Sequence, residues 1–82
     1  MAKKERMSAY ILINIQAGKS VEAVRNIRRK KGVKEVHIVT GLHDAIALVE
    51  GKNLKALTDL IVKGIHKSPG VEKTITCVCV DS

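Results

Sequence analysis

The apolar residues of this chain follow two different spacings, one typical of strands and one typical of helices, in successive segments of the sequence. Four segments are rich in the β-branched residues Val, Ile and Thr, which favour strands. These segments are residues 9–16, 33–40, 45–50 and 71–80. Two further segments, residues 20–31 and 53–67, space their apolar side chains as one face of a helix does. The pattern predicts the order strand, helix, strand, strand, helix, strand.

Residues at the ends of the two predicted helices match the preferences of helix termini. Ser20 is expected to be the N-cap of the first helix, and Gly32 the glycine that ends it. Asn53 is expected to cap the second helix, and the pair Pro69-Gly70 to stop it. These signals separate both helices from the strands that follow them.

The two middle strands are joined by a polar loop, residues 40–44, and are apolar on both faces. In residues 45–50, Ile46 and Leu48 point to one face, while the alanines and the valine between them point to the other. A strand with one face in water would alternate apolar with polar residues. Both faces of this sheet must therefore be covered.

The two halves of the chain resemble each other weakly, since each ends its helix with a Gly-Val pair that leads into a strand. These pairs are Gly32-Val33 and Gly70-Val71. Two such halves on one four-stranded antiparallel sheet make an α+β, ferredoxin-like βαββαβ sandwich. Right-handed crossovers place both helices on one side of that sheet. The other face then needs a second copy of the domain, so we expect a face-to-face dimer.

The chain has 82 residues, enough for one domain, and a formal net charge of +7. Part of this charge forms one cluster in the sequence, with members Arg25, Arg28, Arg29, Lys30, Lys31 and Lys34. A basic patch favours nucleic acid, whereas a solvated helix face with cations near its C-terminal end is the alternative. Tyr10 is the only aromatic residue, so the chain cannot build a platform that stacks single-stranded bases.

The two cysteines, Cys77 and Cys79, are too few and too close for a disulfide framework, and we expect buried thiols. A metal site is not expected, because no second Cys or His pair with ligand spacing accompanies them. No apolar run approaches the roughly 20 residues of a membrane span. The basic start, residues 1–7, leads to no signal-peptide cleavage site. These features indicate a cytoplasmic protein.

Three short motifs resemble the effector-binding domain of the Lrp/AsnC transcription regulators. They are the Gly-x-x-Asp loop in Val39-Thr40-Gly41-Leu42-His43-Asp44, the helix end Pro69-Gly70-Val71, and the strand entry Thr74-Ile75-Thr76. Their order and spacing follow the family's pattern over nearly the whole chain. We therefore expect one domain over residues 8–82, preceded by a basic tail, residues 1–7.

The resemblance implies a dimeric α/β barrel whose dimers assemble into rings, octamers or decamers, and bind a small molecule, usually an amino acid. The ligand-binding residues implied by matching position are Thr40, Gly41, Leu42, His43, Asp44, Thr74 and Thr76. Asp44 can pair with an α-ammonium group, and threonine hydroxyls can donate to a carboxylate. Alternatively, Asp44 only stabilises its turn and the threonines are ordinary strand residues. No catalytic residue, metal or cofactor is implied.

Family regulators carry a helix-turn-helix domain before this one, whereas only seven residues precede Ser8 here. The sequence thus predicts an effector domain without direct sequence-specific DNA binding and without a membrane partner. Such a domain would modulate amino-acid metabolism or transcription through assembly, with full-length Lrp/AsnC regulators as candidate partners. Two alternatives remain, a nucleic-acid-associated protein acting through the basic cluster and a small ferredoxin-like enzyme. The enzyme is disfavoured because no catalytic triad, metal triad or phosphate loop stands out.

Overall fold

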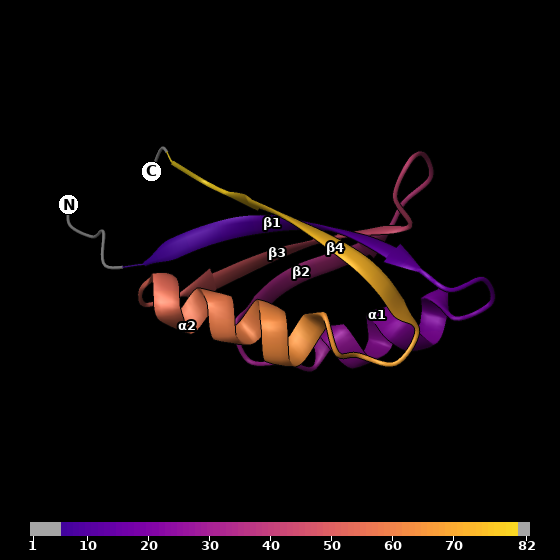
Figure 1. Cartoon of the computed structure of the whole chain (residues 1–82), viewed down its shortest axis with the longest axis horizontal. Coiled ribbons are helices and arrows are strands. Elements are labelled where there is room, and N and C mark those ends of the chain that lie inside the picture. Colours follow the sequence, from indigo (N-terminus) through magenta and orange to yellow (C-terminus); the bar gives the residue numbers. More distant parts are fainter. Residues whose placement is uncertain (1–5, 81–82) are drawn as a thin grey trace.

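Figure 1 shows a four-stranded sheet with both helical segments packed against one of its faces. This computed structural model describes residues 6–80 of the chain. The elements, in chain order, are β1 (Met7–Ile15), α1 (Ser20–Arg28), β2 (Val33–Ile38), β3 (Ala45–Gly51), α2 (Leu54–Asp59), the π-helical segment η1 (Leu60–Ile65) and β4 (Val71–Val78). The predicted order of elements is confirmed, with η1 continuing α2.

The strands are antiparallel and lie in the order β2-β3-β1-β4, so β3 and β1 are central. The register places Ile13 of β1 between Ala45 of β3 and Thr74 of β4. Two βαβ halves arranged in this way form the ferredoxin-like α+β fold that the sequence predicts. The pairing of β1 with β4 shifts register between Asn14 and Ile15, at the end of the sheet from which the loop of residues 40–44 emerges.

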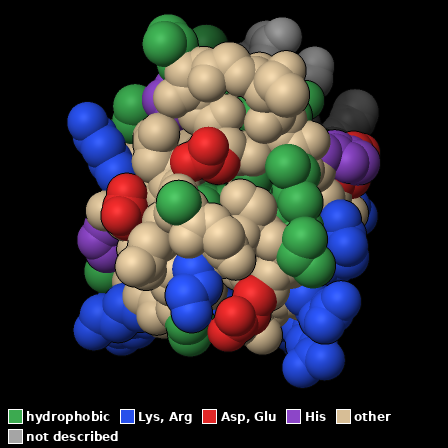
Figure 2. Space-filling view, turned by 90° about the vertical axis from the view of Figure 1, so that its right-hand side faces the viewer, with side chains coloured by type: hydrophobic (Ala, Val, Ile, Leu, Met, Phe, Trp, Pro, Cys, Tyr) green, Lys and Arg blue, Asp and Glu red, His purple; other side chains and the backbone are tan. Residues whose placement is uncertain are grey.

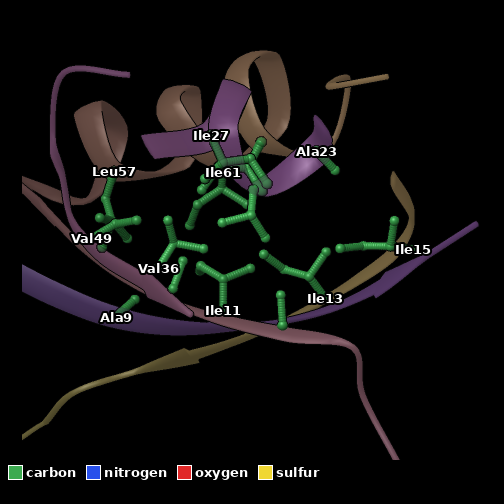
Figure 3. Packing of buried hydrophobic residues seen from close by; sticks show 14 residues of the cluster. Ala9, Ile11, Ile13, Ile15, Ala23, Ile27, Val36, Val49, Leu57 and Ile61 are labelled. Atoms are coloured by element: carbon green, nitrogen blue, oxygen red, sulfur yellow. The ribbon is translucent and has the colours of Figure 1, made fainter. Parts of the chain in front are cut away.

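The hydrophobic core lies between the sheet and the helices (Figure 3). Every second residue of β1 points into it, because side chains alternate between the faces of a strand. The buried residues of the sheet are Ala9, Ile11, Ile13, Ile15, Val36, Ala45, Ala47 and Val49. The helical segments supply the opposite wall with Ala23, Val24, Ile27, Leu57, Ile61 and Ile65. The predicted apolar stripes of both helices are therefore the ones that are buried.

The opposite face of the sheet is also apolar, and no described element packs over it. We call it the open face; its central residues are Tyr10, Leu12, Ile46, Leu48, Ile75 and Cys77. Tyr10 is 47% exposed and Ile75 is 39% exposed. The prediction of a sheet that is apolar on both faces is confirmed. The expectation of buried thiols is wrong for the single chain, because Cys77 is exposed and Cys79 half-buried.

The helix ends match the sequence expectations only in part. Asn53 caps α2 as predicted, with its Oδ1 accepting the Ala56 N–H at 2.8 Å. Ser20 is not the N-cap of α1; it is the first helical residue, after Lys19, whose side chain makes no capping hydrogen bond. Gly32 does not end α1 directly, because the helix stops at Arg28 and Gly32 belongs to the turn before β2.

The turn at Gly32 brings the chain after α1 into close contact with η1. Gly32 has a φ of +100°, a backbone conformation that residues with a side chain rarely adopt. A Cβ added there would lie 2.8 Å from Leu60 Cδ2 and 3.1 Å from the Glu50 carbonyl oxygen. Both the conformation and the lack of space therefore require glycine at this position.

Residues 1–5 of the predicted basic tail lie outside the described part of the chain, whereas Met7 already belongs to β1. Within residues 6–80, neither helical segment has the length and hydropathy that crossing a bilayer requires.

We expect Gly32→Ala to destabilise the fold more than Gly18→Ala, which serves as a matched control. Gly18 also has a positive φ, +83°, but an added Cβ would meet no atom within 4 Å. Gly18→Ala should cost about 1 kcal/mol for the backbone conformation alone. Gly32→Ala should cost about 1–3 kcal/mol more for overpacking. Urea unfolding at fixed protein concentration measures both; equal losses would show that Leu60 yields without cost.

Candidate functional site

The loop of residues 40–44 projects from the sheet on the side away from the helices (Figure 1). Its base is closed by the Val39 N–H, which donates to the Asp44 carbonyl at 2.9 Å. The Asp44 N–H in turn donates to the Ile13 carbonyl at 2.9 Å. The loop is thus tied both to itself and to the neighbouring strand β1. Both bonds fix where the loop begins and ends.

The Asp44 carboxylate holds the end of β1. Its Oδ2 accepts the backbone N–H of Ile15 at 2.7 Å, and this bond is partly buried. That distance is typical of a strong hydrogen bond to an ionised acceptor. Among residues 6–80 no other group donates a hydrogen bond to this carboxylate, so Oδ1 has no hydrogen-bond partner there. Asp44 therefore stabilises the loop through one carboxylate oxygen and leaves the other without a hydrogen-bond partner in the described part of the chain.

Asn14 of β1 supports the loop tip from below. Its Nδ2 donates to the Leu42 carbonyl at 3.2 Å, and its Oδ1 lies 3.1 Å from His43 Nδ1. A carbonyl can only accept, so the amide nitrogen must face Leu42 and the amide oxygen must face His43. His43 Nδ1 then carries the proton and donates it. In the neutral ring, Nε2 is left as an acceptor.

The tip of the loop is largely exposed. Leu42 is 90% exposed, an unusual position for a large apolar side chain. Gly41 has a φ of +129°, and nothing lies within 4 Å of where its Cβ would be. Thr40 is exposed beside it. Figure 2 looks at this end of the molecule and shows most Lys and Arg side chains in its lower half, on the helix side.

The two threonines lie elsewhere in the single chain. Thr74 and Thr76 of β4 pair with Ile13 and Ile11, both buried beneath the helices, so their side chains point to the helix side of the sheet. Thr74 Oγ1 lies 3.3 Å from His66 Nδ1, just after η1. The structure therefore brings together the loop residues and Asn14. It does not bring the Thr74 and Thr76 hydroxyls to them within one chain.

A family model for the Lrp/AsnC ligand binding domain matches residues 8–82 of this chain. The chain belongs to the Lrp/AsnC family. A related protein is the HTH-type transcriptional regulator FL11 of Pyrococcus abyssi, 35% identical over 72 residues, which are 88% of this chain and 47% of that protein. The chain thus spans about half the length of this curated relative.

Solved structures show the same Lrp/AsnC fold. The protein TTHA0845 from Thermus thermophilus has a TM-score of 0.87 at 32% identity, and the match covers 93% of this chain and 95% of that one. The transcriptional regulator NMB0573 from Neisseria meningitidis, solved as a complex with L-Met, has a TM-score of 0.81 at 17% identity. That match covers 93% of this chain and 51% of that one, and it bears on the fold alone.

Two residues of this Lrp/AsnC domain contact the predicted site residues but were not predicted themselves. Asn14 is a polar residue inside the otherwise apolar run of β1, and that break in the pattern was a signal that could have indicated it. His66 had no comparable signal, because it contacts Thr74 only through the packing of η1 near β4. No group of three His, Cys, Asp or Glu within the described residues could hold a metal ion.

We expect Asp44→Ala and Asp44→Asn to separate the structural role of this carboxylate from its charge. Asp44→Ala leaves the partly buried Ile15 N–H without an acceptor, which should cost about 1–3 kcal/mol. Asn retains an oxygen at the same place and should cost less than about half of that. Hydrogen exchange at the Ile15 amide and urea unfolding measure both effects. Unchanged exchange in Asp44→Ala would show that the 2.7 Å bond contributes nothing to stability.

Proposed function

We propose that this Lrp/AsnC domain binds a free α-amino acid at the loop of residues 40–44, in a site that copies of the domain complete together. The observation that carries the proposal is the separation of Asp44 from the Thr74 and Thr76 hydroxyls, which lie on the other side of the sheet. An amino acid presents an ammonium and a carboxylate. Asp44 Oδ1 suits the first, and hydroxyl groups suit the second.

The exposed tip of the loop supports a site between copies. A site formed by one chain would bury most of its ligand, whereas Gly41 and Leu42 stand in solvent. Leu42 would contact the neighbouring copy or the side chain of the ligand. His43 Nε2 would accept a hydrogen bond, because Asn14 fixes the proton on Nδ1. The solved complex of NMB0573 with L-Met makes methionine one of the amino acids to test first.

Assembly through the open face supports the same proposal. Burying one of its large apolar side chains completely is worth roughly 1.5–3 kcal/mol. A second copy of the chain presents the same apolar surface, as the self-complementary interface of a two-fold dimer requires. Because Thr74 and Thr76 point away from the open face, a neighbouring dimer would have to bring them to the loop. Binding and higher assembly would then strengthen each other, because a ligand shared by two copies favours the state in which they are together.

The open face would also allow this chain to pair with full-length regulators of the family. The curated relative FL11 is an HTH-type transcriptional regulator about twice as long as the matched segment. A regulator of that kind with a similar domain could pair with this chain through the open face, and mixed assemblies would change how the regulator acts on transcription. Co-purification of a tagged FL11-type regulator with this chain tests the idea, and exclusive recovery of homo-oligomers would contradict it.

We expect Leu12→Asp to reduce the chain to a monomer, because a charge on the open face cannot be buried against a second copy. Val21→Asp is the matched control, since Val21 is an exposed apolar residue of α1 on the helix side, 62% exposed. Light scattering at micromolar concentration gives the masses, and circular dichroism verifies the fold. The proposal fails if the parent chain is already a folded monomer, or if both variants lose assembly equally.

We expect Asp44→Asn to weaken amino-acid binding by about tenfold or more, about 1.4 kcal/mol, because it removes the charge that pairs with the ammonium. A panel of the standard α-amino acids, screened by thermal shift, identifies the ligand, and isothermal titration gives its Kd. Asp59→Asn is the control, because Asp59 is an acid on α2 that pairs with Lys55 at 3.4 Å, away from the loop.

Thr76→Val tests the second half of the site, since it removes one hydroxyl and keeps the shape of a β-branched side chain. It should weaken binding in the assembled protein, and Leu12→Asp should weaken binding along with assembly. If Asp44→Asn and Thr76→Val both bind the selected amino acid as tightly as the parent chain, the site lies elsewhere.

A further inference from the structure

Two neighbouring hollows share lining residues and together form one groove. The first, of about 620 Å³, lies between the end of α1 and η1 and is lined by Arg29, Lys30 and Lys31. The second, of about 530 Å³, lies beside the start of α2. Both are lined by Lys31 and Leu60, so Leu60 is at the point where they meet. We call this the basic groove; its cations are Arg6, Arg29, Lys30, Lys31, Lys34 and Lys52.

Two close packing contacts fix the position of residues that line the groove. Leu60 fits against Gly32, where no side chain could be accommodated. The stem of Lys30 lies along Gly64 of η1, with Lys30 Cδ 3.1 Å from where a Cβ of residue 64 would be. The long apolar stem of a lysine can lie on an apolar surface while its ammonium group stays in water. The Lys30 side chain thus lines the hollow between α1 and η1.

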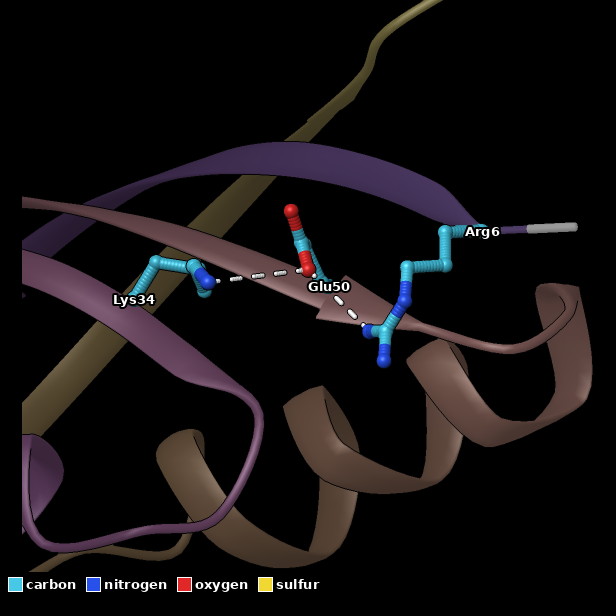
Figure 4. A network of polar contacts seen from close by, with 3 residues as sticks. All are labelled: Arg6, Lys34 and Glu50. Carbon is cyan, nitrogen blue, oxygen red and sulfur yellow. Dashed lines mark hydrogen bonds and ion pairs between the residues drawn. The ribbon is translucent and has the colours of Figure 1, made fainter. Parts of the chain in front are cut away.

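The groove has far more positive than negative charge. Glu50 is its only carboxylate among the residues that line the two hollows. Its Oε1 lies 3.1 Å from Arg6 Nη1 and 3.9 Å from Lys34 Nζ (Figure 4). Within residues 6–80 no carboxylate lies within 4.0 Å of the other four cations. Like charges gathered in this way repel one another, and a bound polyanion would remove that repulsion.

We propose that the basic groove binds the sugar–phosphate backbone of double-stranded DNA without reading its sequence. This inference is independent of the amino-acid site. The hollows are open to solvent and run across several elements, whereas a small-molecule site encloses its ligand. Neither hollow has an aromatic lining residue on which single-stranded bases could stack. Phosphate contacts from Lys and Arg suffice for sequence-independent binding.

The position of the groove allows DNA binding and assembly at once. The hollow between α1 and η1 lies on the helix side, while the apolar residues of the open face, including Tyr10 and Leu12, point the opposite way. The second hollow reaches the end of the sheet, where Glu50 lies opposite Ser8. A dimer formed through the open face would therefore expose the hollow between α1 and η1 of each copy, on opposite outer surfaces. Because the two hollows would face in opposite directions, each would contact a duplex of its own.

Fluorescence anisotropy with a labelled DNA duplex of arbitrary sequence, titrated over a range of KCl concentrations, tests the proposal. The groove variant is Arg29→Ala/Lys31→Ala. Its control, Lys19→Ala/Lys67→Ala, removes the same formal charge from exposed residues that line neither hollow. The parent should bind with an affinity that falls steeply with salt. The groove variant should lose about tenfold or more and flatten the salt slope by about 2, and the control should stay within about twofold.

Three outcomes would overturn the proposal. The first is no binding by the parent at low salt. The second is an equal loss in the groove variant and the control, which would assign the binding to net charge alone. The third is displacement of the duplex by inorganic tripolyphosphate at the same phosphate concentration, which would point to a small polyphosphate ligand. Thermal unfolding and light scattering of both variants verify that fold and assembly are retained.

Discussion

A four-stranded sheet has two faces, and the two helical segments of this chain cover only one of them. That constraint accounts for the rest of the molecule. The covered face forms the whole core, whose strand residues, such as Ile11 and Ile13, have no exposed surface. The open face, with Tyr10 and Leu12, is as apolar as one side of a hydrophobic core, but no described element covers it. The candidate ligand loop and the hollow between α1 and η1 then lie on opposite sides of the sheet.

In the loop of residues 40–44, Asp44 stabilises the fold and also belongs to the proposed site. Asp44 accepts the N–H of Ile15 with one oxygen, and the proposed ligand would bind the other. Asn14 orients His43 and the Leu42 carbonyl with the two ends of one amide. The alternatives weighed for Asp44, a structural role or a ligand role, are therefore compatible. The loop is pre-organised, because its partners belong to a central strand rather than to another loop.

The sequence predicted a helix end correctly where a hydrogen bond between residues close in the chain determines it. Asn53 caps α2 through the N–H three residues on. The predictions that Ser20 caps α1 and that Gly32 ends it were wrong, and at the C-terminal end of α1 contacts between distant segments decide the structure. Arg28, the last residue of α1, donates from its side chain to the Val36 carbonyl of β2, and Gly32 is needed where the chain passes Leu60. The π-helical turn of η1 had no signal in the apolar spacing.

The sequence by itself determined the fold class, the helix stripes and the apolarity of both sheet faces, since these depend on residue type and spacing along the chain. Only the tertiary structure decided which site residues meet. Thr74 and Thr76 point to the helix side because of the register of β4 against β1, and Asn14 reaches the loop across 28 residues of chain. The basic groove likewise gathers charges from distant segments. Strand register and packing between elements determine where these side chains lie, and the spacing of residues along the chain does not reveal either of them.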